Sequence, residues 1–180
     1  MGDMENNQLV LSEELILLNL EVQNQVDALS KMAKNLEELG FVKNSYKQAV
    51  IEREKIFPTG LQGSEIGIAI PHTDAIHVNQ QSISVAVLNQ PVEFIHMGSE
   101  DQKVSVKIVF MLAIEKADSQ LEMLQKLINL IQQEEVLQQI IKSEPRKEVL
   151  DLLRKELRGG IQNEKNISSL WIRNCDIHSS

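Results

Sequence analysis

Residues 65–77, EIGIAIPHTDAIH, place a short apolar run directly before a proline and a histidine. The run EIGIAI is typical of a buried strand, and Pro71 ends it because proline cannot donate to a sheet ladder. The pattern therefore puts His72 at the C-terminal edge of a sheet, where the sites of open α/β folds gather. A neutral imidazole keeps one lone pair, which can act as a base or attack phosphorus. A surface-loop histidine without function is the alternative.

Other strand-like segments lie on either side of this stretch. SISVAVL and VSVKIVFMLAI alternate or are wholly apolar, and the end of the second is typical of a central strand with both faces covered. The expected strands are residues 14–20, 65–70, 82–88 and 104–114, with 92–95 as a short further one.

Helical patterns bracket the strands. Gly40 stands where the C-terminal cap of a first helix belongs, and Pro58 limits a second helix to residues 45–57. Ser45 with Gln48, and Ser119 with Glu122, have the spacing of capping boxes. Further helices are expected over 135–142 and 145–157. The buried stripes are expected to be Val22, Val26, Leu29, Ala33 and Leu36 in the first helix and Leu121, Leu124, Ile128 and Ile131 in the third.

This order of elements predicts an α/β fold, a central mixed β-sheet flanked by helices in a single domain. The domain is expected to span residues 9–158, because the polar segment 159–180 has no clear hydrophobic period. We expect that segment to be a loosely ordered C-terminal tail.

Composition excludes several classes of function. A formal net charge of −8 without a Lys/Arg cluster argues against nucleic-acid binding. The single cysteine, Cys175, excludes an internal disulfide and a cysteine-built zinc site, and favours a reducing, cytoplasmic setting. The polar start MGDMENNQ lacks a secretory layout, and the longest apolar run, IVFMLAI, is too short to span a membrane. The sequence contains neither the P-loop motif G-x-x-x-x-G-K-[ST] nor the dinucleotide-binding motif G-x-G-x-x-G. It also lacks the G-x-S-x-G motif of a nucleophilic serine.

A metal site built from His72, Asp74 and His77 is an alternative with weaker support. In an extended segment residues 72 and 74 share one face and residue 77 lies on the other, and zinc needs three or four ligands. The other histidines, His96 and His178, lie in unrelated polar segments. His77 is more simply interpreted as an imidazole hydrogen-bonded to a neighbour.

Arg53 is the second unusual residue. It lies on the apolar stripe of the helix 45–57, together with Tyr46, Val50 and Phe57. A guanidinium in such a position is paired with a carboxylate, reaches solvent, or binds an anion. The sequence pattern leaves an ion pair with a nearby glutamate, exposure at the surface and anion binding open.

EREKIFPTGL (52–61) and IGIAIPHTDAIH (66–77) together resemble the type-2 (fructose/mannitol-type) IIA components of the bacterial phosphoenolpyruvate-dependent sugar phosphotransferase system. The resemblance covers about residues 10–155. Within the family, FPTG, IAIPH followed by AIH, and QLEMLQKL (120–127) are most similar to the galactitol-type branch.

The resemblance implies a cytoplasmic phosphocarrier. His72 would be the phosphorylated nucleophile and Arg53 the stabiliser of the phosphoryl charge, with supporting roles for Thr59 and His77. Gln120 stands where mannitol- and fructose-type members carry a second pocket histidine, and Thr73 stands where the family usually has a small residue.

The resemblance also implies protein partners. Phospho-HPr would be the donor and a separate IIB protein the acceptor, with a membrane IIC component acting indirectly. No metal or nucleotide cofactor is then needed. Two other functions stay open: a phosphorylation-dependent regulatory module like the nitrogen-type members of the family, and a metal-dependent hydrolase. The residues themselves do not indicate which sugar is transported.

Overall fold

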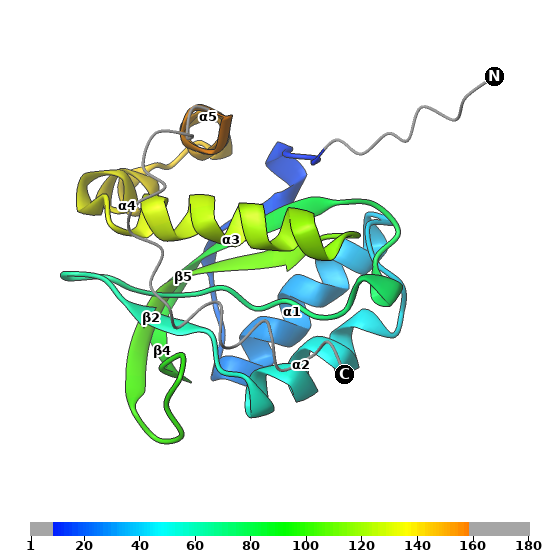
Figure 1. The fold of residues 1–180 in the computed structure, drawn as a ribbon. Helices are drawn as coiled ribbons and strands as arrows, with labels where there is room; N and C mark the ends of the chain where they lie inside the picture. The colour runs from blue at the N-terminus through cyan, green and yellow to red at the C-terminus, as the bar shows by residue number, and fades with distance from the viewer. Residues whose placement is uncertain (1–8, 159–180) are drawn as a thin grey trace.

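A five-stranded sheet runs through the centre of the computed structural model, which describes residues 9–158 (Figure 1). The strand order is β1-β4-β5-β3-β2. The strands are β1 (Ile16–Leu20), β2 (Gly60–Gln62), β3 (Gly67–Ala69), β4 (Ser82–Ile95) and β5 (Lys103–Ala113). The pairs β1–β4 and β3–β5 are parallel, whereas β4–β5 and β2–β3 are antiparallel. The predicted mixed sheet is thereby confirmed.

Helices cover both faces of this sheet (Figure 1). They are α1 (Gln25–Glu38), α2 (Tyr46–Ile56), α3 (Ala117–Ile131), α4 (Glu134–Lys142) and α5 (Arg146–Arg158), with short 3-10 turns η1 (Glu13–Leu15) and η2 (Ala75–His77). Helices α1 and α2 pack with Ala69 and Met111 on one face. Helices α3, α4 and α5 pack with Ile68 and Phe110 on the other. Because successive strand residues point to opposite faces, the apolar strands supply two cores.

The strands differ from the expected ones in two places. Residues 92–95 do not form a separate strand; they continue β4, which changes register against β5 between Val87 and Val92. Strand β2 was missed because it has only three residues. Its neighbour β3 lies close to β5, since a Cβ atom on Gly67 would collide with the carbonyl oxygen of Ser105.

Helix α1 begins later than the hydrophobic pattern suggests. Its N-cap is Asn24, whose side chain accepts a hydrogen bond of 2.9 Å from the Asp27 N–H. Gly40, with φ of +84°, follows the helix end as predicted. The predicted stripe is wrong at Val26, which is 45% exposed. The buried side chains of α1 are Ala28, Leu29, Met32, Ala33 and Leu36.

Both predicted capping boxes are wrong. Ser45 is the N-cap residue of α2, but its side chain makes no capping hydrogen bond. Helix α3 begins at Ala117 after the N-cap Lys116, so Ser119 lies inside the helix. The predicted buried stripe of α3 is also wrong at Leu121, which is exposed. The buried side chains of α3 are Met123, Leu124, Leu127, Leu130 and Ile131.

Two further predictions concern the C-terminal tail and the possibility of a membrane-spanning segment. The predicted loose tail, residues 159–180, lies outside the described residues. Across residues 9–158, none of the helices combines the length and the apolar character that a membrane crossing requires.

Candidate active site at the end of β3

Ile70 and Pro71, which connect β3 to His72, are held by backbone hydrogen bonds to two neighbouring segments. The Ile70 N–H donates to the Thr59 carbonyl oxygen at 3.3 Å. The Pro71 carbonyl oxygen accepts a hydrogen bond of 2.9 Å from the Leu112 N–H of β5. The strand end is therefore held between β5 and the turn that follows α2, and the site that starts at His72 has a rigid base.

The His72 ring is oriented by its own backbone. Its Nδ1 lies 2.9 Å from the carbonyl oxygen of Ile70. A carbonyl oxygen can only accept, so Nδ1 carries the proton and the neutral ring has its lone pair on Nε2. Among the described side chains, which do not include that of Gln120, none forms a hydrogen bond with Nε2. His72 as a whole is only partly buried.

The surroundings of His72 favour the neutral ring. Burial lowers the pKa of His72 to about 4; the Arg53 charge lowers this pKa further, whereas the hydrogen bond to Ile70 and the Asp74 charge raise it. At neutral pH the imidazole is therefore uncharged, the state that nucleophilic attack requires.

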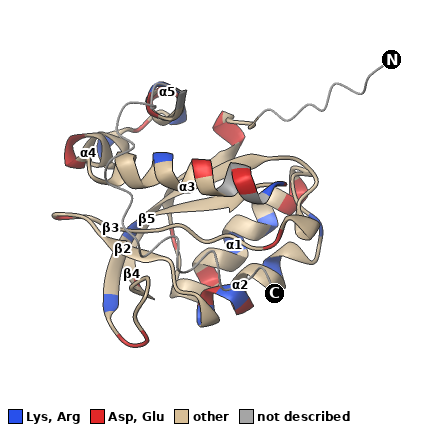
Figure 2. Ribbon diagram, viewed as in Figure 1, with Lys and Arg blue, Asp and Glu red and all other residues tan. Residues whose placement is uncertain are grey.

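Arg53 projects from the last turn of α2 toward the same loop. Its Nη1 lies 3.8 Å from Asp74 Oδ1, and its Cζ lies 5.3 Å from the centre of the Phe57 ring. The Arg53 side chain is 21% exposed and that of Asp74 is 72% exposed. An ion pair with one partner in solvent is weak, so the guanidinium can exchange this carboxylate for a stronger anion. Charged residues of both signs gather at this end of α2 (Figure 2).

Glu54 is a site residue that the sequence analysis missed. It is 3% exposed, and its Oε1 accepts hydrogen bonds from the Thr59 N–H at 2.8 Å and from Thr59 Oγ1 at 3.0 Å. Burial raises the pKa of Glu54 to about 8, against the lowering effects of the Thr59 hydrogen bonds and the Arg53 charge. A signal was present, because Glu54 continues the i, i+4 stripe of the buried Tyr46 and Val50.

Tyr46 holds α2 in place against the sheet. Its hydroxyl donates a buried hydrogen bond of 2.6 Å to the carbonyl oxygen of Leu112. Leu112 also donates its N–H to Pro71, so one residue of β5 contacts both the helix that carries Arg53 and the segment that carries His72.

His77 lies at the opposite end of α2. Its Nδ1 is 2.8 Å from Ser45 Oγ, and its carbonyl oxygen accepts from the Lys43 N–H at 2.9 Å. The loop from His72 to Val78 therefore runs back along the helix, from Arg53 toward Ser45. Within the part of the chain that the structure describes, no three His, Cys, Asp or Glu side chains form a group that could hold a metal ion, and this includes His72, Asp74 and His77.

Two other predicted positions can be placed. Thr59 is 4% exposed and lies between Glu54 and Ile70, as described above. Gln120 lies in the first turn of α3, but its side chain is outside the described part of the structure. Its role in the pocket stays a prediction. His96 lies away from this site, with Nδ1 2.7 Å from the Met97 carbonyl oxygen, and His178 is outside the described residues.

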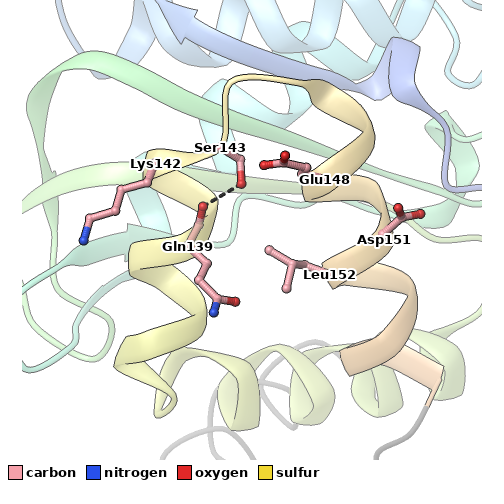
Figure 3. Close-up of a pocket in the computed structure, with 6 residues that line it drawn as sticks. All are labelled: Gln139, Lys142, Ser143, Glu148, Asp151 and Leu152. Carbon is pink, nitrogen blue, oxygen red and sulfur yellow. Dashed lines mark hydrogen bonds between the residues drawn. The ribbon is translucent and has the colours of Figure 1, made fainter.

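A cavity of about 430 Å³ lies between α4 and α5 (Figure 3). Gln139 and Leu152 face it from the two helices, and Ser143 donates a hydrogen bond of 2.6 Å to the Gln139 carbonyl oxygen. The other lining residues are Lys142, Glu148 and Asp151. It contains none of the residues that the sequence analysis predicted for the active site.

The fold and the Pro-His site have counterparts in a known family. The family model for "Phosphoenolpyruvate-dependent sugar phosphotransferase system, EIIA 2" matches residues 9–156. The chain belongs to this family and is a phosphotransferase component, an EIIA phosphocarrier. The predicted family, fold class and type of activity are therefore confirmed.

Individual relatives and solved structures belong to the same family of IIA components. The galactitol-specific EIIA component of Escherichia coli strain K12 is 32% identical over 115 residues, which are 64% of this chain and 76% of that protein. The mannitol-specific IIA component of Staphylococcus aureus is 30% identical over 141 residues, 78% of this chain and 92% of that one. Among solved structures, mannitol enzyme IIA of Escherichia coli, in complex with phosphorylated enzyme IIB, matches with a TM-score of 0.67 and 25% identity, covering 85% of this chain and 100% of that chain.

Proposed function

We propose that His72 carries the phosphoryl group in a relay between two other proteins. Nε2 of the neutral ring attacks the phosphorus of phospho-HPr, so that a P–N bond forms as the bond to the donor breaks. The same group then passes to a cysteine of a separate IIB protein. The observation that carries this proposal is the hydrogen bond from His72 Nδ1 to Ile70, which leaves the Nε2 lone pair free.

Arg53 is the proposed stabiliser of the phosphoryl charge. Phosphoryl transfer requires mainly positioning and electrostatic stabilisation of the equatorial oxygens. The Arg53 charge is close enough to lower the pKa of His72, and its present partner, Asp74, is largely in solvent. As the phosphoryl group arrives, Arg53 exchanges the Asp74 carboxylate for the phosphoryl oxygens.

Two large apolar side chains are exposed near the two ends of α2, one on the helix and one on the loop that follows His72. Ile56, in the last turn of α2, is 69% exposed, and Ile76, in the loop after His72, is 70% exposed. Large apolar side chains that remain in solvent are common at protein contacts. Because donor and acceptor must both reach His72, each contact is expected to be transient, burying ~1,200 Å² or less.

We propose galactitol or a related polyol as the transported substrate, with a galactitol-type IIB partner and, indirectly, a IIC component in the membrane. The support is the identity with the galactitol-specific component and the matching FPTG, IAIPH and AIH segments. The chain would then act in the cytoplasm. Selectivity for the sugar would lie in the membrane component.

Labelling tests the proposal directly. Radiolabelled phosphoenolpyruvate with enzyme I and HPr is expected to label the wild-type protein and the His77→Ala variant, but not His72→Ala. Circular dichroism checks that both variants fold. Undiminished labelling of His72→Ala would overturn the assignment.

A second experiment separates transport from regulation. The labelled protein is mixed with purified galactitol-type, mannitol-type and fructose-type IIB proteins, and the label is followed onto the IIB cysteine. Rapid transfer to the galactitol-type protein supports the proposed substrate. Absence of transfer to all three would favour a phosphorylation-dependent regulatory module.

A further inference from the structure

We propose that Glu54 and Thr59 are positioning residues, which aim the His72 ring by fixing the backbone of Ile70, whose carbonyl oxygen accepts a hydrogen bond from the ring. This inference rests on the proposed function of His72 as phosphoryl acceptor. Neither residue needs to touch the phosphoryl group. Their effect passes through a chain of hydrogen bonds that joins the last turn of α2 to the end of β3.

The chain has a defined order of donors and acceptors. Thr59 Oγ1 donates its single hydroxyl proton to the Glu54 carboxyl group, which lies at 3.0 Å through Oε1 and 2.9 Å through Oε2. The lone pairs of Thr59 Oγ1 are then free to accept from the Ile70 N–H at 3.2 Å. Ile70 in turn accepts from His72 Nδ1 at 2.9 Å. Every donor in this chain therefore faces an acceptor.

Burial makes this chain hard to replace by water. Glu54 is 3% exposed, Thr59 is 4% exposed and Ile70 is fully buried. A buried donor that loses its acceptor costs more than an ordinary hydrogen bond contributes, so the three groups hold one geometry. Removal of the Thr59 hydroxyl would leave the Ile70 N–H with only its longer contact to the Thr59 carbonyl oxygen.

The same Glu54 side chain also affects Arg53, the cation of the site. Glu54 and Arg53 are neighbours in the last turn of α2. The hydrogen bonds from Thr59 to Glu54 therefore fix the turn from which the guanidinium projects. One buried side chain thus sets the spacing between the nucleophile and the charge that stabilises the transferred group. A displacement of about 1 Å at such a centre can reduce the rate on the order of 100-fold.

Two isosteric variants test the chain, with one conservative control. Thr59→Val keeps the shape but removes the hydroxyl, Glu54→Gln keeps an acceptor oxygen but replaces the titratable carboxyl group by an amide, and Thr59→Ser keeps the hydroxyl. The turnover number and the KM for phospho-HPr are measured for transfer to each folded variant. The ring tautomer of His72 is read from the ¹⁵N resonances of Nδ1 and Nε2.

The expected result is a loss in turnover with binding unchanged. Thr59→Val should lower the turnover number roughly tenfold to 100-fold while KM stays as in the wild type, because the buried residue contacts no partner. Glu54→Gln should give a smaller loss, and Thr59→Ser should restore the wild-type rate. In Thr59→Val the fraction of His72 with its proton on Nδ1 should fall.

Two outcomes overturn the proposal. The first is a wild-type turnover number and a wild-type tautomer in both Thr59→Val and Glu54→Gln, even where both variants are less stable, because that would show a structural role alone. The second is an equal loss in Thr59→Ser. Failure of the proposed function is distinct: the wild-type protein would then take no label from phospho-HPr, whereas the tautomer measurement on the unphosphorylated variants would still support or refute the positioning role.

Discussion

Arg53 Nη1 lies 3.8 Å from Asp74 Oδ1, so the cation of the site is already paired in the unphosphorylated protein. Asp74 lies two residues after His72, and its charge acts on the imidazole against that of Arg53. In the proposed function, Asp74 pairs with the guanidinium of Arg53 until the phosphoryl group replaces it. The pair joins α2 to the loop that follows His72, and both of its charges affect the pKa of His72.

Asp74→Asn should make the phosphorylated form longer-lived. The substitution removes a negative charge beside the phosphoryl group and frees Arg53 for the phosphoryl oxygens. Because exposed charge pairs contribute about 0.2–1 kcal/mol, the rate of hydrolysis of the phosphoprotein should fall roughly 1.4-fold to fivefold. Purified phosphoprotein incubated at neutral pH gives this rate, and Asp101→Asn, in the β4–β5 turn, is the control. Faster hydrolysis in Asp74→Asn would show that the carboxylate protects the phosphoryl group.

Arg53→Gln should retain the fold and slow phosphoryl transfer. Loss of one preorganised donor at a developing oxyanion costs on the order of 100-fold to 1,000-fold in rate. The matched control is Lys55→Gln, which removes a positive charge from an exposed position on the same turn of α2. Single-turnover labelling by phospho-HPr measures both. Equal losses in the two variants would indicate that general charge, and not Arg53, is responsible.

The imidazole of His72 should titrate far below the usual range. Burial lowers its pKa to about 4, so an NMR titration of the His72 ring should show a midpoint near that value and no change around pH 6.5. In Arg53→Gln the midpoint should rise, because the cation that opposes protonation is gone while Asp74 remains. A wild-type midpoint near 6.5 would mean that the ring is solvated in solution.

The buried carboxyl of Glu54 should give the protein an unusual pH dependence of stability. Its pKa is raised from 4.5 to about 8, so the folded state binds the extra proton, and the contribution to stability is complete below pH 4.5 and is lost as the pH rises through 8. The lowered pKa of His72 acts in the opposite direction, since its contribution is complete above 6.5 and is lost as the pH falls toward 4. Of these two groups, Glu54 is the one whose contribution to stability changes between pH 6.5 and 8.

Urea unfolding measures this contribution. The free energy of unfolding of the wild-type protein should fall from pH 6.5 to pH 8, and the fall should disappear in Glu54→Gln. Glu52→Gln, at an exposed position of α2, serves as the control and should retain it. The same slope in the wild type and in Glu54→Gln would mean that Glu54 is ionised throughout this range.

Local sequence was sufficient for the part of the fold that carries His72. An apolar run before Pro71 is typical of a strand that ends there, and this predicts the position of the histidine without any knowledge of the other strands. Similarly, the wholly apolar end of β5 predicts that both of its faces are covered. The three-residue strand β2 was not predictable, because it forms only through pairing with β3.

The errors come from contacts between residues distant in sequence. Ser45 has the spacing of a capping residue, but its hydroxyl is bonded to His77, 32 positions later, and no local pattern contains that contact. Glu54 is different, because its partner Thr59 is only five positions later and its place on the stripe of Tyr46 and Val50 was a local signal that was not used. Arg53 was recognised as unusual, but its carboxylate partner comes from the loop after β3 and not from its own helix.

The group that orients the His72 ring is a main-chain carbonyl, that of Ile70, and every amino acid supplies one. Substitution of the side chain at residue 70 therefore leaves the hydrogen-bond acceptor present. The surface around the imidazole is free to diverge as partners change during evolution, while the direction of the reactive nitrogen is inherited with the path of the polypeptide.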